Sequence, residues 1–168
     1  MILCLKNKID DGGYSVIIKD ENKVYKLFKN SINVKRLRSF EDKLINLVFN
    51  SEVDAYKITQ NVKELQRYVP EFYGTVNVEK VEDENCKDVS NLYLLNCCYS
   101  MEFINGHFYK LFLSNLSDEV QRVIKLFYDN GINYLEDSCV AFVSDTNFRI
   151  IDFATNDAYH ENEMKYLL

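Results

Sequence analysis

Three kinds of residue in this sequence are suited to chemistry: a lysine on an apolar strand, two adjacent carboxylates and an aspartate at the end of an apolar run. Lys26 lies in KVYKLFK, and side-chain alternation puts it on the same strand face as Val24 and Phe28. Its stem could also simply lie along the sheet while the charge reaches water. Glu136 and Asp137 are adjacent, and a general base needs a carboxylate that accepts the hydrogen bond of a hydroxyl group.

The cysteines and histidines do not form the pattern of a zinc site. The chain has five cysteines, and no C-x-x-C pair combines with a histidine at zinc-ligand spacing. The only histidines are His107 and His160. An odd number of thiols fits a reducing, cytosol-like compartment, including the cytosol of a host cell, with the cysteines acting as packing residues.

Two strands and a helical region are predicted in the first part of the chain. Tyr14–Lys19 and Lys23–Lys29 are rich in β-branched and aromatic residues, and the turn residues Asp20-Glu21-Asn22 between them predict a hairpin. From about Val34 to Arg67 apolar residues recur at three- and four-residue intervals without glycine or proline. This pattern predicts helix, with a break near Asn50-Ser51.

The rest of the chain alternates between short strands and one amphipathic helix. Pro70 ends the helical region and introduces a predicted strand over 70–82, which a charged turn joins to a second strand over 92–102. An apolar segment over 108–113 precedes a helix over 120–130, for which Ser117 is the expected N-cap and Gly131 the stop. Two short strands over 140–143 and 148–153 follow, and the tail over 161–168 has the composition of a last helical turn or two.

Composition and charge exclude several classes of protein. The chain has 168 residues, 47% of them hydrophobic and 14% aromatic, which fits one globular domain. The formal net charge is -6 and the basic residues are dispersed, so neither nucleic acid nor an anionic membrane is an expected partner. The longest apolar stretch, within 92–103, is interrupted by Asn96 and Ser100 and is too short to span a bilayer.

The order of these elements, with the residues at their joints, resembles the protein-kinase fold. Gly12, Gly13 and Ser15 resemble the glycine-rich loop, with Asp10 in place of its first glycine. In the family this loop covers the phosphates of ATP and offers them backbone N–H groups, which requires small residues. Lys26 resembles the lysine that contacts the α- and β-phosphates.

The helical region and the strand end that follows carry two further parts of the resemblance. Glu52 resembles the helix glutamate that pairs with the kinase lysine, and Glu41 is the second candidate because the helical region is long. The strand end resembles the gatekeeper and hinge. Met101 would be the gatekeeper, and the backbone of the next three residues would bond the adenine: Glu102, Phe103 and Ile104.

The segment GINYLEDSCVAFVSDTNFRIIDFA resembles the catalytic and metal-binding loops of the family. The resemblance implies that Asp152, followed by Phe153 and Ala154, holds Mg²⁺ against the β- and γ-phosphates. Alignment on Gly131-Ile132 brings Glu136 or Asp137 to the position of the catalytic base, and both alternatives remain open.

Two residues depart from the kinase pattern in that same segment. Tyr134 occupies the position of the motif histidine, and Ala141 that of the metal-binding asparagine. Alanine offers no oxygen to a second Mg²⁺, so one of the two clamps that neutralise charge would be lost.

The resemblance implies an α+β, protein-kinase-like, two-lobed fold over 1–168, with a five-stranded antiparallel sheet in the N-lobe (about 1–103) and a strongly reduced helical C-lobe (104–168). The implied function is a pseudokinase that binds, or once bound, ATP and Mg²⁺ in an interlobe cleft and regulates a partner protein. The alternative is an active minimal protein kinase with a protein substrate. A third interpretation is an α+β domain whose motif matches are accidental.

Overall fold

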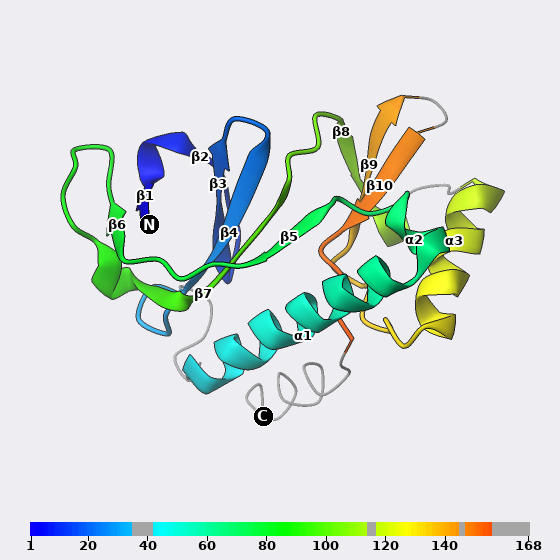
Figure 1. Cartoon of the computed structure of the whole chain (residues 1–168), viewed down its shortest axis with the longest axis horizontal. Helices are drawn as coiled ribbons and strands as arrows, with labels where there is room; N and C mark the ends of the chain where they lie inside the picture. Colours follow the sequence, from blue (N-terminus) through cyan, green and yellow to red (C-terminus); the bar gives the residue numbers. More distant parts are fainter. Residues whose placement is uncertain (35–41, 114–116, 145–146, 156–168) are drawn as a thin grey trace. The chain divides into compact units, whose positions relative to one another are not determined.

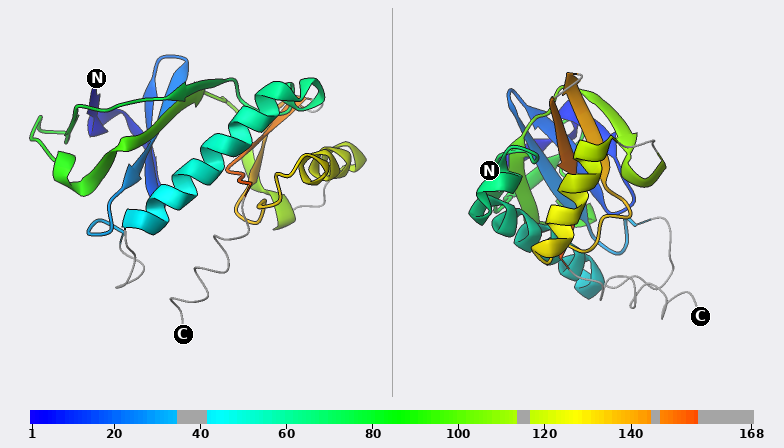
Figure 2. Two further views of the ribbon diagram at one scale, coloured as in Figure 1. Left: turned by 60° about the horizontal axis from the view of Figure 1, so that its bottom comes forward. Right: turned by 90° about the vertical axis from the view of Figure 1, so that its right-hand side faces the viewer.

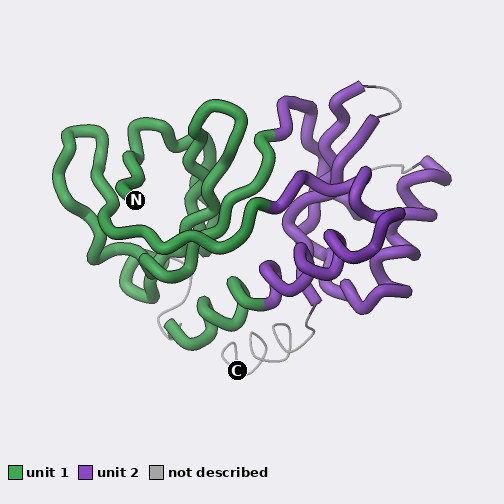
Figure 3. Tube along the Cα trace, viewed as in Figure 1, with its two compact units in different colours: residues 1–50, 73–103, 159–168 green, residues 51–72, 104–158 purple. Residues whose placement is uncertain are grey.

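The computed structural model describes residues 1–34, 42–113, 117–144 and 147–155 and divides the chain into two compact units. Unit 1 contains Met1–Asn50 and Tyr73–Phe103, and unit 2 contains Ser51–Phe72 and the described residues from Ile104 onward (Figure 3). The two units are taken in turn below. The described part of the chain contains no helix with both the length and the apolar character that a bilayer-spanning helix requires.

A five-stranded sheet forms the centre of unit 1 and confirms the predicted antiparallel sheet (Figure 1). The hairpin around Glu21 is also confirmed, because Ser15 pairs with Phe28 and Asp20 with Lys23. Glu21 has a φ of 51°, a value found in tight turns. In order across the sheet, the strands are β2 (Lys8–Asp11), β3 (Ser15–Asp20), β4 (Lys23–Lys29), β7 (Tyr93–Glu102) and β5 (Phe72–Thr75).

A second, two-stranded sheet supplies part of the core of unit 1. Here β1 (Ile2–Cys4) pairs in parallel with β6 (Lys80–Glu82). The prediction of a single strand over 70–82 is therefore wrong, because β5 and β6 belong to different sheets. The backbone N–H groups of Val76 and Val78 still donate to carbonyls of β7, and only then does the chain pair with β1 as β6. Side chains of both sheets, together with Val78 between β5 and β6, form one buried cluster: Leu3, Val16, Ile18, Leu27, Val78, Val81, Tyr93 and Cys98.

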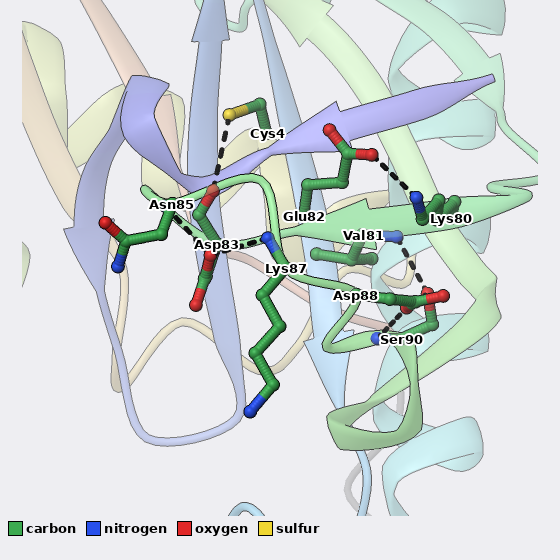
Figure 4. Close-up of polar contacts among 9 residues, drawn as sticks. All are labelled: Cys4, Lys80, Val81, Glu82, Asp83, Asn85, Lys87, Asp88 and Ser90. Carbon is green, nitrogen blue, oxygen red and sulfur yellow. Dashed lines mark hydrogen bonds and ion pairs between the residues drawn. The ribbon is translucent and has the colours of Figure 1, made fainter.

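The acidic residues after β6 build a turn (Figure 4). One carboxylate oxygen of Asp83 accepts the backbone N–H groups of Asn85 and Lys87, each at 2.9 Å. Asp88 accepts both the N–H and the hydroxyl of Ser90, at 2.9 and 2.6 Å. These hydrogen bonds explain the cluster of aspartates by local turn chemistry.

The main helix, α1 (Asp42–Asn61), is continuous through Asn50-Ser51, so the break expected there is wrong (Figures 1 and 2). Asparagine and serine are only slightly worse helix formers than alanine, and the apolar positions around them continue the buried side of the helix. The interruption instead lies at Val62, which has extended backbone and precedes the short helix α2 (Lys63–Gln66).

Unit 2 contains a three-stranded antiparallel sheet in the order β10-β9-β8. The predicted C-terminal hairpin corresponds to β9 (Cys139–Ser144) and β10 (Asn147–Ile151). The apolar segment expected over 108–113 is mostly a third strand, β8 (His107–Lys110), followed by a single 3₁₀ turn. A Cβ on Gly106 would lie 2.6 Å from the carbonyl oxygen of Phe142, so glycine is required where the chain enters β8.

The helix α3 (Asp118–Asp129) confirms both predicted end signals. The Ser117 side chain accepts the N–H of Val120, and Gly131, just beyond the end, has a φ of 79°. Aromatic side chains of unit 2 pack together in its core, with ring centroids 4.6 Å apart for Tyr56–Phe153 and 4.9 Å for Phe127–Phe153. The predicted helical turns over 161–168 lie outside the described residues.

Candidate functional site

Lys26 lies on the central strand β4 of unit 1, with only 7% of its surface exposed. Val24 and Phe28, which share its strand face, are also buried. The Lys26 Nζ lies 5.7 Å from the ring centroid of Phe28 and 6.0 Å from that of Tyr99, its partner on β7. These rings stabilise the ammonium through their negative faces. The lysine is therefore held within the structure and is not a surface residue.

The glycine turn joins β2 to β3. The Gly12 N–H donates to the carbonyl of Ser15 at 2.9 Å, and Ser15 is buried. Neither Gly12 nor Gly13 has a positive φ, so backbone conformation does not require glycine at these positions. A Cβ on Gly13 would meet no atom within 4 Å, which leaves open space of the kind that close approach of a ligand needs.

A second buried lysine, which the sequence analysis did not single out, fixes this turn. The Lys29 Nζ donates to the Asp11 carboxylate at 2.6 Å and to the Gly12 carbonyl at 2.5 Å. Hydrogen bonds from Lys29 and Lys8 lower the pKa of Asp11 to about 2. The signal was present in the sequence, because KVYKLFK carries a second lysine in the same apolar strand.

The predicted gatekeeper and hinge lie at the end of β7. Met101 is buried and pairs with Val24. The Phe103 N–H donates to the Asn22 carbonyl at 2.9 Å, and the Lys19 Nζ lies 3.9 Å from the Phe103 ring centroid. The Phe103 amide therefore already donates within unit 1, and the assignment of Glu102, Phe103 and Ile104 to the hinge stays a prediction.

Asp152 follows β10 in unit 2 with a left-handed backbone, at a φ of 61°. Aspartate tolerates this region better than most residues, and such conformations cluster at functional sites. The Asp152 carbonyl accepts a 2.7 Å hydrogen bond from the hydroxyl of the fully buried Ser138. The next side chain, Phe153, is also fully buried. The Ser138 hydrogen bond and the burial of Phe153 together fix the backbone of Asp152.

The two candidate bases lie on a loop that is joined to the segment after Asp152. Tyr134 and Ala154 exchange two backbone hydrogen bonds, at 3.0 and 3.1 Å. The Tyr134 hydroxyl donates to the Asp137 carboxylate at 3.2 Å. Glu136 and Asp137 are both exposed. The structure thus brings the predicted base loop and the predicted metal-binding segment together within unit 2, with Asp137 already accepting one hydrogen bond.

Ala141 lies in β9 between Phe108 and Arg149 and is fully buried. It contributes no oxygen ligand. In the described ranges, no three histidine, cysteine or carboxylate side chains gather as they would around a metal ion.

The predicted ion pair between the strand lysine and a helix glutamate stays a prediction. Glu52 lies in α1 and is 9% exposed. It belongs to unit 2, whereas Lys26 belongs to unit 1. The second candidate, Glu41, lies outside the described residues.

No family model and no curated protein matches this chain.

Proposed function

We propose that this chain is a protein-kinase-like nucleotide-binding protein that acts as a pseudokinase and regulates a partner protein. The observation that carries the proposal is a buried lysine at the third strand in chain order of a five-stranded sheet, followed by a long helix with a buried glutamate. The order of the strands across this sheet is β2-β3-β4-β7-β5, so β7 lies next to β4 and β5 lies at the edge. The kinase resemblance implies the same elements in the same order along the chain.

The position of Lys26 supports a role in binding an anion. The residue is buried on β4, and the kinase resemblance implies that the lysine of this strand contacts the α- and β-phosphates. The phosphates of a nucleoside triphosphate supply several negative charges to its ammonium group. The open space over Gly13 supports a place for phosphates beside the turn that Lys29 fixes.

Asp152 is the residue proposed to bind Mg²⁺. Magnesium commonly uses only one or two protein carboxylates, completed by substrate phosphates and water. A single aspartate on a backbone fixed by Ser138 and Phe153 fits this requirement. When bound, the metal would neutralise phosphate charge.

Three features favour a pseudokinase over an active enzyme. Ala141 cannot ligate a second metal ion, Tyr134 replaces the motif histidine, and the Asp137 carboxylate accepts a hydrogen bond from Tyr134. Each change weakens either charge stabilisation or base chemistry. The second candidate function is slow transfer of the γ-phosphoryl group to a protein hydroxyl. It is favoured by Glu136, an exposed carboxylate on the loop joined to the Asp152 segment.

Thermal unfolding with increasing ATP and Mg²⁺ tests nucleotide binding, because a ligand of the native state raises its stability. We expect a rise in melting temperature that depends on both, and a smaller rise for Asp152→Asn. No rise at millimolar ATP and Mg²⁺ would contradict the proposal.

Incubation with γ-labelled ATP and a cell lysate separates the two candidates. Labelling that Asp152→Asn and Glu136→Gln both abolish would establish the enzyme, whereas nucleotide binding without transfer supports the pseudokinase.

A further inference from the structure

The cysteines of this protein lie in different surroundings. Cys97 and Cys98, neighbours on β7, are 1% and 0% exposed, as their predicted packing role requires. Cys86 is exposed on the turn after β6, so the prediction of a packing role is wrong for this residue. An exposed thiol can react with oxidants in solution, whereas a buried one is largely inert.

Cys86 and Cys4 contact the same oxygen atom. The Asp83 carbonyl accepts the Cys86 backbone N–H at 3.1 Å, and the Cys4 thiol donates to this carbonyl at 3.8 Å. Figure 4 shows the Cys4 sulfur directed at the Asp83 carbonyl. The two cysteines come from segments far apart in the sequence, and both belong to unit 1. The fold therefore brings both residues to one acceptor.

Strand pairing fixes the position of Cys4. The last residues of β1 and β6, Cys4 and Glu82, are partners in the parallel pair. A shift of this register by one residue would expose Leu3 and Val81, which are buried. Asp83 follows Glu82 directly, so its carbonyl lies beside the end of β1.

The turn itself fixes the backbone of Cys86. The Asp83 N–H donates to the Lys87 carbonyl at 2.9 Å, and the Asp83 carboxylate accepts the Lys87 N–H at 2.9 Å. Cys86 has a φ of 61°, in the left-handed region. A residue other than glycine keeps this conformation only where the surrounding structure enforces it, and such conformations cluster at functional sites.

The other cysteines are not placed to react with Cys86. Cys97 and Cys98 are buried, and as adjacent strand residues they point to opposite faces of the sheet, so they do not bond each other. Cys139 belongs to unit 2. Within unit 1, Cys4 is the partly buried thiol that the structure places beside the Cys86 turn.

We propose that hydrogen peroxide converts Cys4 and Cys86 into a reversible disulfide that ties β1 to the turn after β6. The Cys86 thiolate sulfur bonds one peroxide oxygen, the O–O bond breaks, and the hydroxide that leaves takes up the thiol proton to become water. The Cys4 sulfur then displaces the hydroxyl group from the Cys86 sulfur, and with the Cys4 proton this group leaves as a second water. The two thiols lose two electrons, and the peroxide is reduced to water.

The disulfide would enclose most of the five-stranded sheet of unit 1. The strands β2, β3, β4 and β5 all lie between Cys4 and Cys86 along the chain. A cross-link that closes a long segment stabilises a protein mainly by restricting its unfolded chain, so we expect a melting temperature higher by roughly 5 °C or more. Disulfides in a reducing compartment are usually transient and sense oxidants, which fits a reversible bond.

Mass spectrometry of the full chain after stepwise oxidation with hydrogen peroxide tests the inference. Free thiols are alkylated, and the protein is digested without reductant. We expect a linked pair of peptides that contain Cys4 and Cys86 and that dithiothreitol separates. The experiment is done without nucleotide, so its outcome is independent of the proposed nucleotide binding.

Variants identify the order of the two steps. Cys86→Ser should leave Cys4 as a free thiol at the same peroxide dose, because the exposed thiol that reacts first is absent. Cys4→Ser should accumulate sulfenic acid on Cys86, which dimedone traps to a several-fold greater extent than in wild type. Cys139→Ser is the matched control, since it removes a partly buried thiol of unit 2; it should form the linked peptides as wild type does.

Thermal unfolding measures the effect of the bond. Oxidised wild type and oxidised Cys139→Ser should melt at higher temperatures than their reduced forms, whereas Cys4→Ser and Cys86→Ser should show no rise. Circular dichroism identifies any variant that fails to fold.

Three results would overturn the inference. They are absence of the Cys4–Cys86 link at every peroxide dose that leaves wild type folded, a link from Cys86 to a second copy of the chain instead of Cys4, or equal melting temperatures for linked and reduced wild type.

Discussion

The five-stranded sheet of unit 1 and the three-stranded sheet of unit 2 hold their positive charges in different ways. In unit 1, β4 is an internal strand that buries Lys26 and Lys29, which are 7% and 9% exposed. In unit 2, Lys110 lies on an exposed edge strand and Arg149 donates to neutral oxygens. A buried ammonium persists only where the surrounding structure compensates for lost hydration. The comparison therefore separates lysines buried on an internal strand from cations on the two outer strands of a sheet.

The largest expected effect contrasts an interior ring with an edge ring of unit 2. Phe153 is fully buried against Tyr56 and Phe127, whereas Phe108 is 49% exposed. Phe153→Ala should lower the free energy of unfolding by about 3–5 kcal/mol, and Phe108→Ala by less than about 1 kcal/mol. Chemical denaturation of both variants measures the difference. Equal losses would mean that the Phe108 ring contributes as much to the core of unit 2 as the buried Phe153 ring does.

Lys29 should matter more for stability than any surface lysine of unit 1. Lys29→Met leaves the Asp11 carboxylate and the Gly12 carbonyl without this donor, and we expect a loss of about 1–3 kcal/mol. Lys87→Met, on the exposed turn after β6, is the control and should change the free energy of unfolding by less than about 0.5 kcal/mol. If both variants are as stable as wild type, Lys29 does not anchor the glycine turn.

The Asp11 interaction also predicts a pH dependence. Its pKa is lowered to about 2 in the folded protein, so its contribution is complete above the unfolded value of about 4. It is lost as the pH falls from about 4 to about 2. Because Asp11 is largely exposed, we expect less than about 1 kcal/mol. Denaturation at several pH values in this range should show a smaller acid-induced loss in Asp11→Asn than in wild type, and identical losses would contradict the assignment.

The smallest expected effect concerns the thiols of β7. Burial raises the pKa of Cys97 to about 11 and that of Cys98 to about 12, so both are protonated at neutral pH. Cys86 is exposed and serves as the internal comparison. Iodoacetamide should label Cys86 first and leave Cys97 and Cys98 unmodified in the folded protein, as mass spectrometry of peptides would reveal. Early labelling of Cys98 would indicate that the sheet opens readily.

Sequence patterns predicted the parts of this fold that depend on local chemistry. The hairpin around Glu21, the Ser117 cap and the lysine on the apolar face of β4 all follow from alternation, turn residues and capping. The sequence did not predict that 70–82 would divide between two sheets, because strand pairing depends on β1, far away in the sequence. It also missed β8, since the short run HFYK becomes a strand only through its pairing with β9.

The candidate site was predictable in residue type but not in its supporting contacts. Lys26, Glu52 and Asp152 stand out by position in their elements. The hydrogen bonds of Lys29 to the glycine turn and of Ser138 to the Asp152 carbonyl join segments that no short motif relates. Such contacts appear only when the chain is folded.

Calorimetric titration of ATP with Mg²⁺ into wild type, Lys26→Met and Lys87→Met tests the central claim most directly. Methionine retains much of the apolar stem of lysine and removes its charge. We predict that wild type and Lys87→Met bind the nucleotide with the same affinity and that Lys26→Met binds it at least about tenfold more weakly. Equal affinity for wild type and a folded Lys26→Met variant would contradict the account, because the buried lysine would then have no part in nucleotide binding.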